Sequence, residues 1–186
     1  MEGNSLSEQL TEVYRDHWTG LYWLFLAPLS ALYFSLPLAV IAFMGVLDVI
    51  MKRKSLEYGF NLFGIQLEAL IAIIAGIVYG PLNGALIAGT VYFIASIVSQ
   101  NVGPFLLWKT PGFALLAGMT AFVYPAGNFF MAFQLPAVFR IVFVIVGLKL
   151  TPAQAAQGVL YEGTAPIFTL FMFQAFGERI LEFLLV

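Results

Sequence analysis

Long stretches without charge dominate this chain. From Leu21 to Met51 the only charged residue is Asp48, and most of the remaining chain consists of apolar tracts broken by single polar residues and Gly/Pro turns. About 20 consecutive apolar residues cross the hydrocarbon core of a bilayer, and the 186 residues hold several such tracts. The surface of a water-soluble domain is charged throughout, whereas here charged residues make up 10% and hydrophobic residues 61%. The sequence therefore predicts an all-α, polytopic helix bundle, integral to the lipid bilayer of the cell membrane.

The tracts predict about six transmembrane helices, with five or seven as alternatives. Pro28 and Pro37 should kink the first one, for which a tight re-entrant pair is the alternative. Tyr79-Gly80-Pro81 has the composition of a turn between the second and third, and residues 100–111 are expected to form a loop. We expect an N-terminal amphipathic segment over residues 1–20 and a single transmembrane bundle over 21–186. The six predicted helices cover residues 23–46, 56 or 60–78, 82–99, 112–124, 129–148 and 152–176.

Several kinds of chemistry are disfavoured by composition. The chain has no cysteine and one histidine, His17, which lies outside the predicted helices, so we expect no metal site and no cofactor. No glycine-rich loop is followed by Lys and Ser or Thr, as an ATP-binding loop would be. The basic patch Lys52-Arg53-Lys54 is too short for nucleic-acid binding and suits lipid headgroups. We predict that the chain is not an enzyme and that any energy for transport comes from a partner subunit or an ion gradient.

Three ionisable residues within the predicted helices need an explanation, because such groups are costly in a membrane and are functional candidates by default. They are Glu68, centred in the second helix, Arg140 in the fifth and Glu162 in the sixth. One interpretation is a buried ion pair of Arg140 with Glu68 or Glu162. A second is that all three line a substrate cavity, and a third is proton coupling through a carboxylate.

Other polar residues lie near the predicted helix ends. Asn101, Trp108, Lys109 and Asn128 are either an aromatic anchor with solvated loop residues or contacts to a ligand. Asp48 is expected to cap a helix or to pair locally with the basic patch. Small residues in the third and fourth helices predict close helix packing. These small residues are Gly84, Ala85, Ala88, Gly89, Ala95, Gly112 and Gly118.

Three features carry a resemblance to a known family. The first is in residues 76–89, where a bulky residue is followed by Gly-Pro-x-x-Gly-Ala and further small residues. The second is the glycine-containing entry to the fourth helix, residues 103–118. The third is the spacing of four residues between Ala27 and Ala31. These features resemble the substrate-capturing S subunits of energy-coupling-factor (ECF) vitamin transporters. In that family the first motif is the hinge between helices 2 and 3, and spaced alanines dock the subunit onto its membrane partner. Six helices are also typical of the bacterial rod-shape scaffolds.

The resemblance implies uptake of a vitamin-like small molecule, driven by a membrane-embedded partner and two ATPase subunits. The solute would bind between the loop after helix 1 and the outer ends of helices 4 to 6. Its candidate contacts are Asn101, Trp108, Lys109, Asn128, Arg140 and Glu162. The alternatives are a non-catalytic accessory or scaffold subunit of a larger membrane complex and, third, a small enzyme that processes acyl chains or phospholipids.

The family resemblance and the distribution of positive residues predict different orientations of the chain in the membrane. S subunits keep both termini and the turn between helices 2 and 3 in the cytoplasm. Positive residues favour the cytoplasmic side, and Lys52, Arg53, Lys54, Lys109 and Lys149 fall on one side, against Arg15 and Arg179 on the other. The charge pattern therefore places the termini and this turn outside, so the two lines of reasoning predict opposite orientations.

Overall fold

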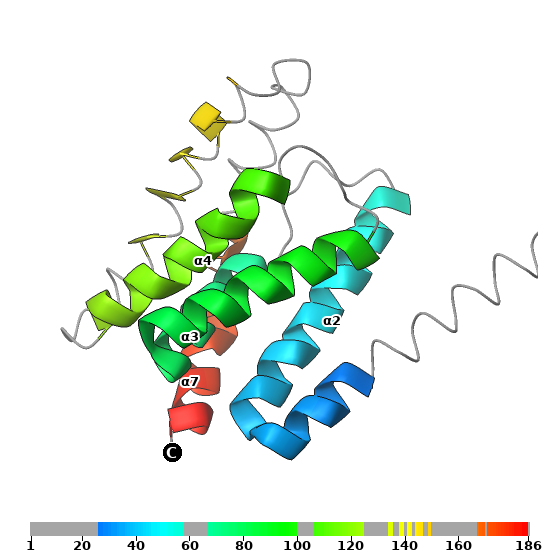
Figure 1. Cartoon of the computed structure of the whole chain (residues 1–186), viewed down its shortest axis with the longest axis vertical. Coiled ribbons are helices and arrows are strands. Elements are labelled where there is room, and N and C mark those ends of the chain that lie inside the picture. Colours follow the sequence, from blue (N-terminus) through cyan, green and yellow to red (C-terminus); the bar gives the residue numbers. More distant parts are fainter. Residues whose placement is uncertain are drawn as a thin grey trace, which may run out of the picture. The chain divides into compact units, whose positions relative to one another are not determined.

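The computed structural model describes residues 26–57, 67–99 and 106–124, short pieces between 134 and 149, and residues 167–169 and 171–185. By its internal contacts the chain divides into two compact units, Met1–Phe43 and Met44–Val186. The described residues are almost entirely helical and contain no strand (Figure 1). This agrees with the all-α prediction, while the predicted segment boundary at residue 20 lies outside the described residues.

The first apolar tract is helical but divided. Residues 26–34 form one helix, Ser35 is non-helical, and α2 follows as Leu36–Glu57. The Ser35 hydroxyl accepts a hydrogen bond from the Leu38 N–H at 3.3 Å, so it caps the start of α2. Pro37 lies in the first turn of α2, where a proline is tolerated because its missing N–H would have no intrahelical partner. The predicted kink near Pro37 is thus a helix boundary two residues before it.

Helix α3, Glu68–Val98, is a hairpin of two helical arms rather than one rod. Gly80 has φ 78° and ψ −178°, a conformation essentially restricted to glycine, and Pro81 follows it. A Cβ on Gly84 would lie 2.6 Å from the Ala75 carbonyl oxygen and 2.7 Å from the Gly76 Cα, so the arms touch backbone to backbone. The predicted turn at Tyr79-Gly80-Pro81 is confirmed, although the first arm begins at Glu68, later than predicted.

Helix α4, Leu106–Val123, packs antiparallel to the second arm of α3 through small residues. A Cβ on Gly89 would lie 3.3 Å from the Ala114 Cβ, and one on Gly118 would lie 3.4 Å from the Pro81 carbonyl oxygen. A Cβ on Gly76, in the first arm, would collide with the backbone of Ala117. These approaches confirm the predicted packing role of Gly84, Gly89 and Gly118.

The start of α4 differs from the prediction of a loop over residues 100–111. The helix already begins at Leu106 and contains Pro111. Pro111 has no N–H to donate to the Leu107 carbonyl four residues earlier, yet the helix continues through it. The Thr110 hydroxyl donates to the Leu106 carbonyl at 2.7 Å, within this turn. The prediction was wrong here because Pro111-Gly112 has the composition of a helix boundary without forming one.

The end of the chain holds a π-helical turn, Phe173–Gly177, followed directly by α7, Glu178–Leu185. In α7, Leu181 is buried, whereas Arg179 and Glu182 are exposed. This matches the amphipathic end predicted after Phe176. The described pieces between 134 and 149 are helical where they are placed, in the region of the predicted fifth helix.

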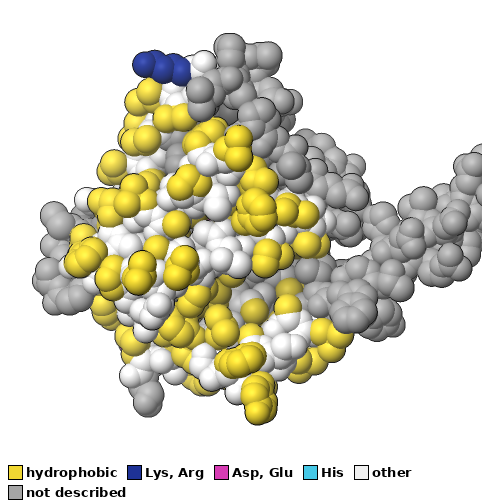
Figure 2. All heavy atoms as spheres, viewed as in Figure 1, with side chains coloured by type: hydrophobic (Ala, Val, Ile, Leu, Met, Phe, Trp, Pro, Cys, Tyr) yellow, Lys and Arg dark blue, Asp and Glu magenta, His cyan; other side chains and the backbone are white. Residues whose placement is uncertain are grey.

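Large apolar side chains lie both in the interior and on the surface of the second unit. Two helices, α3 and α4, are long and apolar enough to cross a membrane. Their exposed residues include Leu82, Leu86, Leu107 and Phe122, each more than 60% exposed. Figure 2 shows hydrophobic side chains covering much of the described face. Six membrane-spanning helices remain a prediction, since several of the predicted spans lie wholly or partly outside the described residues.

Candidate functional site

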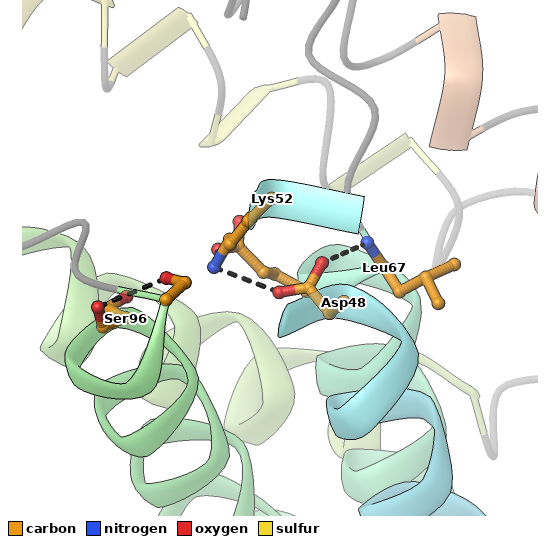
Figure 3. Close-up of polar contacts among 6 residues, drawn as sticks. Asp48, Lys52, Leu67 and Ser96 are labelled. Carbon is orange, nitrogen blue, oxygen red and sulfur yellow. Dashed lines mark hydrogen bonds and ion pairs between the residues drawn. The ribbon is translucent and has the colours of Figure 1, made fainter. Parts of the chain in front are cut away.

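Three charged side chains meet in the interior of the second unit, and we call Asp48, Lys52 and Glu68 the ionic cluster. None of the three exposes more than 5% of its surface. Asp48 and Lys52 lie one turn apart on α2, and the Lys52 Nζ is 2.9 Å from the Asp48 Oδ2. The same Nζ forms an ion pair with the Glu68 Oε1. One ammonium thus joins two carboxylates from two helices, and Figure 3 shows its contact with Asp48.

The start of α3 offsets the second negative charge of the cluster. Asp48 Oδ1 accepts a hydrogen bond from the Leu67 N–H at 2.8 Å. Leu67 is the N-cap residue of α3, and its own side chain provides no cap, so Asp48 acts as the cap from a different helix. Glu68 occupies the first turn of α3, where the helix dipole favours a carboxylate. The ionic cluster is therefore both an ion-pair network and a helix cap.

Aromatic and hydroxyl groups from the second arm of α3 complete the surroundings. The Lys52 Nζ lies 5.2 Å from the centre of the Tyr92 ring, a cation–π distance. The Tyr92 ring packs in turn on Phe113 of α4, with 4.8 Å between ring centres. Ser96, one turn beyond Tyr92, is fully buried, and Figure 3 shows the Lys52 ammonium pointing toward this part of α3. Lys52 thus contacts both arms of α3, and α4 is reached through Tyr92.

The contacts of the ionic cluster hold helices in position. Among the described residues, no group of three or more His, Cys, Asp and Glu side chains is placed to hold a metal ion. The Lys52 ammonium is engaged by two carboxylates, and Asp48 also holds the Leu67 N–H. Removing one member of such a buried network leaves a charge without compensation, which costs about 3–5 kcal/mol. The arrangement fixes the relative position of α2 and the two arms of α3.

The structure describes only part of the predicted solute site. Trp108 and Lys109 lie in the first turn of α4, and the Lys109 Nζ is 5.7 Å from the centre of the Trp108 ring. Both are half-buried. The other candidate contacts lie outside the described residues and stay predictions. They are Asn101, Asn128, Arg140 and Glu162. The structure therefore describes two of the six predicted contacts, Trp108 and Lys109, which are adjacent in the sequence.

The predicted docking alanines lie in the helix over residues 26–34. Ala27 is exposed and Ala31 is buried. Residues four apart lie on one side of a helix, as the docking interpretation requires. Their proposed contact with a partner subunit stays a prediction.

Two predictions about charged residues are corrected. Glu68 is not centred in a helix but is the first residue of α3, and its ion pair is with Lys52; the predicted partner Arg140 lies outside the described residues. Lys52 is buried rather than directed at lipid headgroups. The expected local pairing of Asp48 with the basic patch is confirmed. The Asp48–Lys52 spacing of four residues was a signal for their pairing, whereas only the fold brings Glu68 to Lys52.

Comparison of the whole chain with family models, with characterised proteins and with solved structures gives no match.

Proposed function

We propose that this chain is an integral membrane subunit of the ECF type, which captures a small vitamin-like solute. A membrane-embedded partner and ATPase subunits drive its transport. The observation that carries the proposal is the hinge: Gly80 has a positive φ, and Gly84 allows backbone contact with Ala75. This geometry gives a physical reason for the Gly-Pro-x-x-Gly-Ala motif on which the resemblance rests.

Burial supports the membrane part of the proposal. The charged side chains of the ionic cluster are inside, while several large apolar side chains of α3 and α4, such as Leu86 and Phe122, are exposed. Exposed Leu and Phe side chains would be costly in water, and a lipid environment satisfies them without cost. The buried charges are tolerated because the ammonium pairs with both carboxylates and the start of α3 offsets the remaining negative charge.

An accessory or scaffold subunit is the second candidate function, and the ionic cluster favours it. Its charges are engaged with one another and with the backbone of α3, as expected for groups that hold helices together. In this interpretation the outer faces of α3 and α4 contact partner helices, and no solute is bound.

Purification of the tagged full-length protein from mild detergent, followed by mass spectrometry, distinguishes the two candidates. The ECF proposal expects a bound vitamin-like molecule together with a membrane partner and ATPase subunits. The scaffold alternative expects partner proteins without a solute. A protein that is recovered alone and without a ligand contradicts both.

Orientation provides an independent test. Asn83 is exposed beside the Gly80 turn, and Ser55 lies in the last turns of α2, beyond the ionic cluster. The native chain has no cysteine, so a single cysteine can be placed at either position. The ECF proposal expects Asn83→Cys to be shielded from an impermeant thiol reagent in intact cells and Ser55→Cys to be labelled. The reverse pattern would agree with the charge distribution and contradict the family assignment.

A further inference from the structure

The two arms of the α3 hairpin are held together in different ways at their two ends. At the Gly80 end the contact is between backbones: Gly84 lies against Ala75, and Gly76 lies against Ala117 of α4. Such contacts leave no side chain that could rotate away, so they resist separation. At the far end the contact runs through the Lys52 side chain, which pairs with Glu68 of the first arm and lies over Tyr92 of the second.

The spacing of these contacts places Lys52 at the open end of the hairpin. Glu68 and Tyr92 are equally far from Gly80 in sequence, one in each arm. At a rise of 1.5 Å per residue, each contact lies about 18 Å from the turn. Gly80 itself is unobstructed, since a Cβ built on it would meet no atom within 4 Å. The space on this side of Gly80 is therefore open, while the neighbouring Pro81 carbonyl lies against Gly118 of α4.

We propose that Lys52 is the latch of a hinged hairpin. When Lys52 is ion-paired, it holds the far ends of the two α3 arms together; when it is released, these ends separate while the Gly80 end stays packed. The Tyr92–Phe113 ring contact moves with the second arm, so release of the latch also reaches α4. This device is independent of the proposed transport function, because it follows from contacts within the second unit alone.

Two buried alanines on the second arm provide matched reporters. Ala95 lies between Tyr92 and Ser96 at the latched end, and Ala88 lies beside Gly89, which packs closely against Ala114 of α4; they expose 4% and 2% of their surface. Each is replaced by a single cysteine in the full-length protein, which has none of its own. The rate of reaction with N-ethylmaleimide is then measured on the purified protein in detergent micelles, with and without Lys52→Met.

We expect Lys52→Met to raise the labelling rate of Ala95→Cys by more than about tenfold, because loss of one partner of a buried pair shifts local opening by more than one decade. The rate of Ala88→Cys should not change. Lys149→Met, which removes an exposed lysine outside the cluster, should change neither rate. Continued protection of Ala95→Cys in the Lys52→Met background overturns the proposal.

An equal rise in the labelling rates of Ala95→Cys and Ala88→Cys also overturns the proposal, because it would mean that the whole hairpin loosens and not only its latched end. Glu68→Gln covers the case in which Lys52→Met does not fold. It keeps the shape of the side chain and removes only its charge, so the proposal expects a smaller rise at Ala95→Cys and none at Ala88→Cys. Unchanged labelling of Ala95→Cys in that background contradicts the proposal as well.

Discussion

Replacing Gly84 with alanine tests whether backbone contact closes the α3 hairpin. In an isolated helix, replacing glycine with alanine stabilises the helix by about 0.5–1 kcal/mol, because glycine loses more conformational entropy than alanine on folding. Here the new Cβ would lie 2.6 Å from the Ala75 carbonyl oxygen and 2.8 Å from its carbon. Both atoms belong to the backbone, so the arms must separate to reach an ordinary contact of 3.4 Å or more. Such overpacking costs about 1–3 kcal/mol, and we expect a net loss of roughly 1–2 kcal/mol.

Gly118→Ala is the matched control. Its Cβ would lie 3.4 Å from the Pro81 carbonyl oxygen, an ordinary contact, so the gain in helix propensity should survive. We therefore expect Gly118→Ala to be neutral or more stable by up to about 1 kcal/mol, and the two variants to differ by roughly 1–3 kcal/mol. The measurement is reversible unfolding in mixed micelles as the fraction of denaturing detergent rises, followed by circular dichroism. Equal stability of the two variants would refute the backbone-contact argument.

The remaining predictions use the same unfolding assay or copurification. Lys52→Met leaves two buried carboxylates without a counter-ion and should cost about 3–5 kcal/mol; a loss below about 1 kcal/mol, the value of an exposed pair, would show that the cluster is solvated. Gly80→Ala should cost about 1–3 kcal/mol from backbone strain, although nothing crowds its Cβ, and a neutral result would contradict the positive φ. Replacing Ala27 and Ala31 together by leucine should abolish copurification of a membrane partner while the subunit stays folded. If this double variant unfolds or aggregates instead, these alanines pack within the subunit.

Local sequence patterns were sufficient for the features that depend on a few neighbouring residues. The turn at Gly80 was predictable because glycine followed by proline disfavours helix continuation wherever it occurs. The packing role of Gly84, Gly89 and Gly118 was predictable because small residues are what close helix contact requires. The helical class was predictable because a long apolar tract in a membrane must satisfy its backbone hydrogen bonds internally.

Local patterns failed where two possibilities had similar local energies. Proline within a helix is disfavoured, so the sequence predicts a boundary at Pro111, yet α4 continues through it. The start of α3 at Glu68 was also missed, because Phe60, Leu62, Phe63 and Ile65 extend the apolar tract toward the N-terminus. That start is capped by Asp48, which precedes Leu67 by 19 residues, and no local signal reports a cap supplied from another helix.

The identity of each ion pair was decided by the tertiary structure alone. In the sequence, Lys52 is one of three adjacent basic residues suited to lipid headgroups, and Glu68 is an isolated carboxylate whose expected partner is a distant arginine. The hairpin at Gly80 brings Glu68 and Tyr92 to the same end, and the arrangement of α2 directs Lys52 between them. A charge in an apolar interior is stable only beside its partner, and which partner it meets depends on the packing of several helices. Composition determined that the buried charges must be few. The fold determined that one ammonium pairs with two carboxylates and that the start of α3 offsets the remaining negative charge.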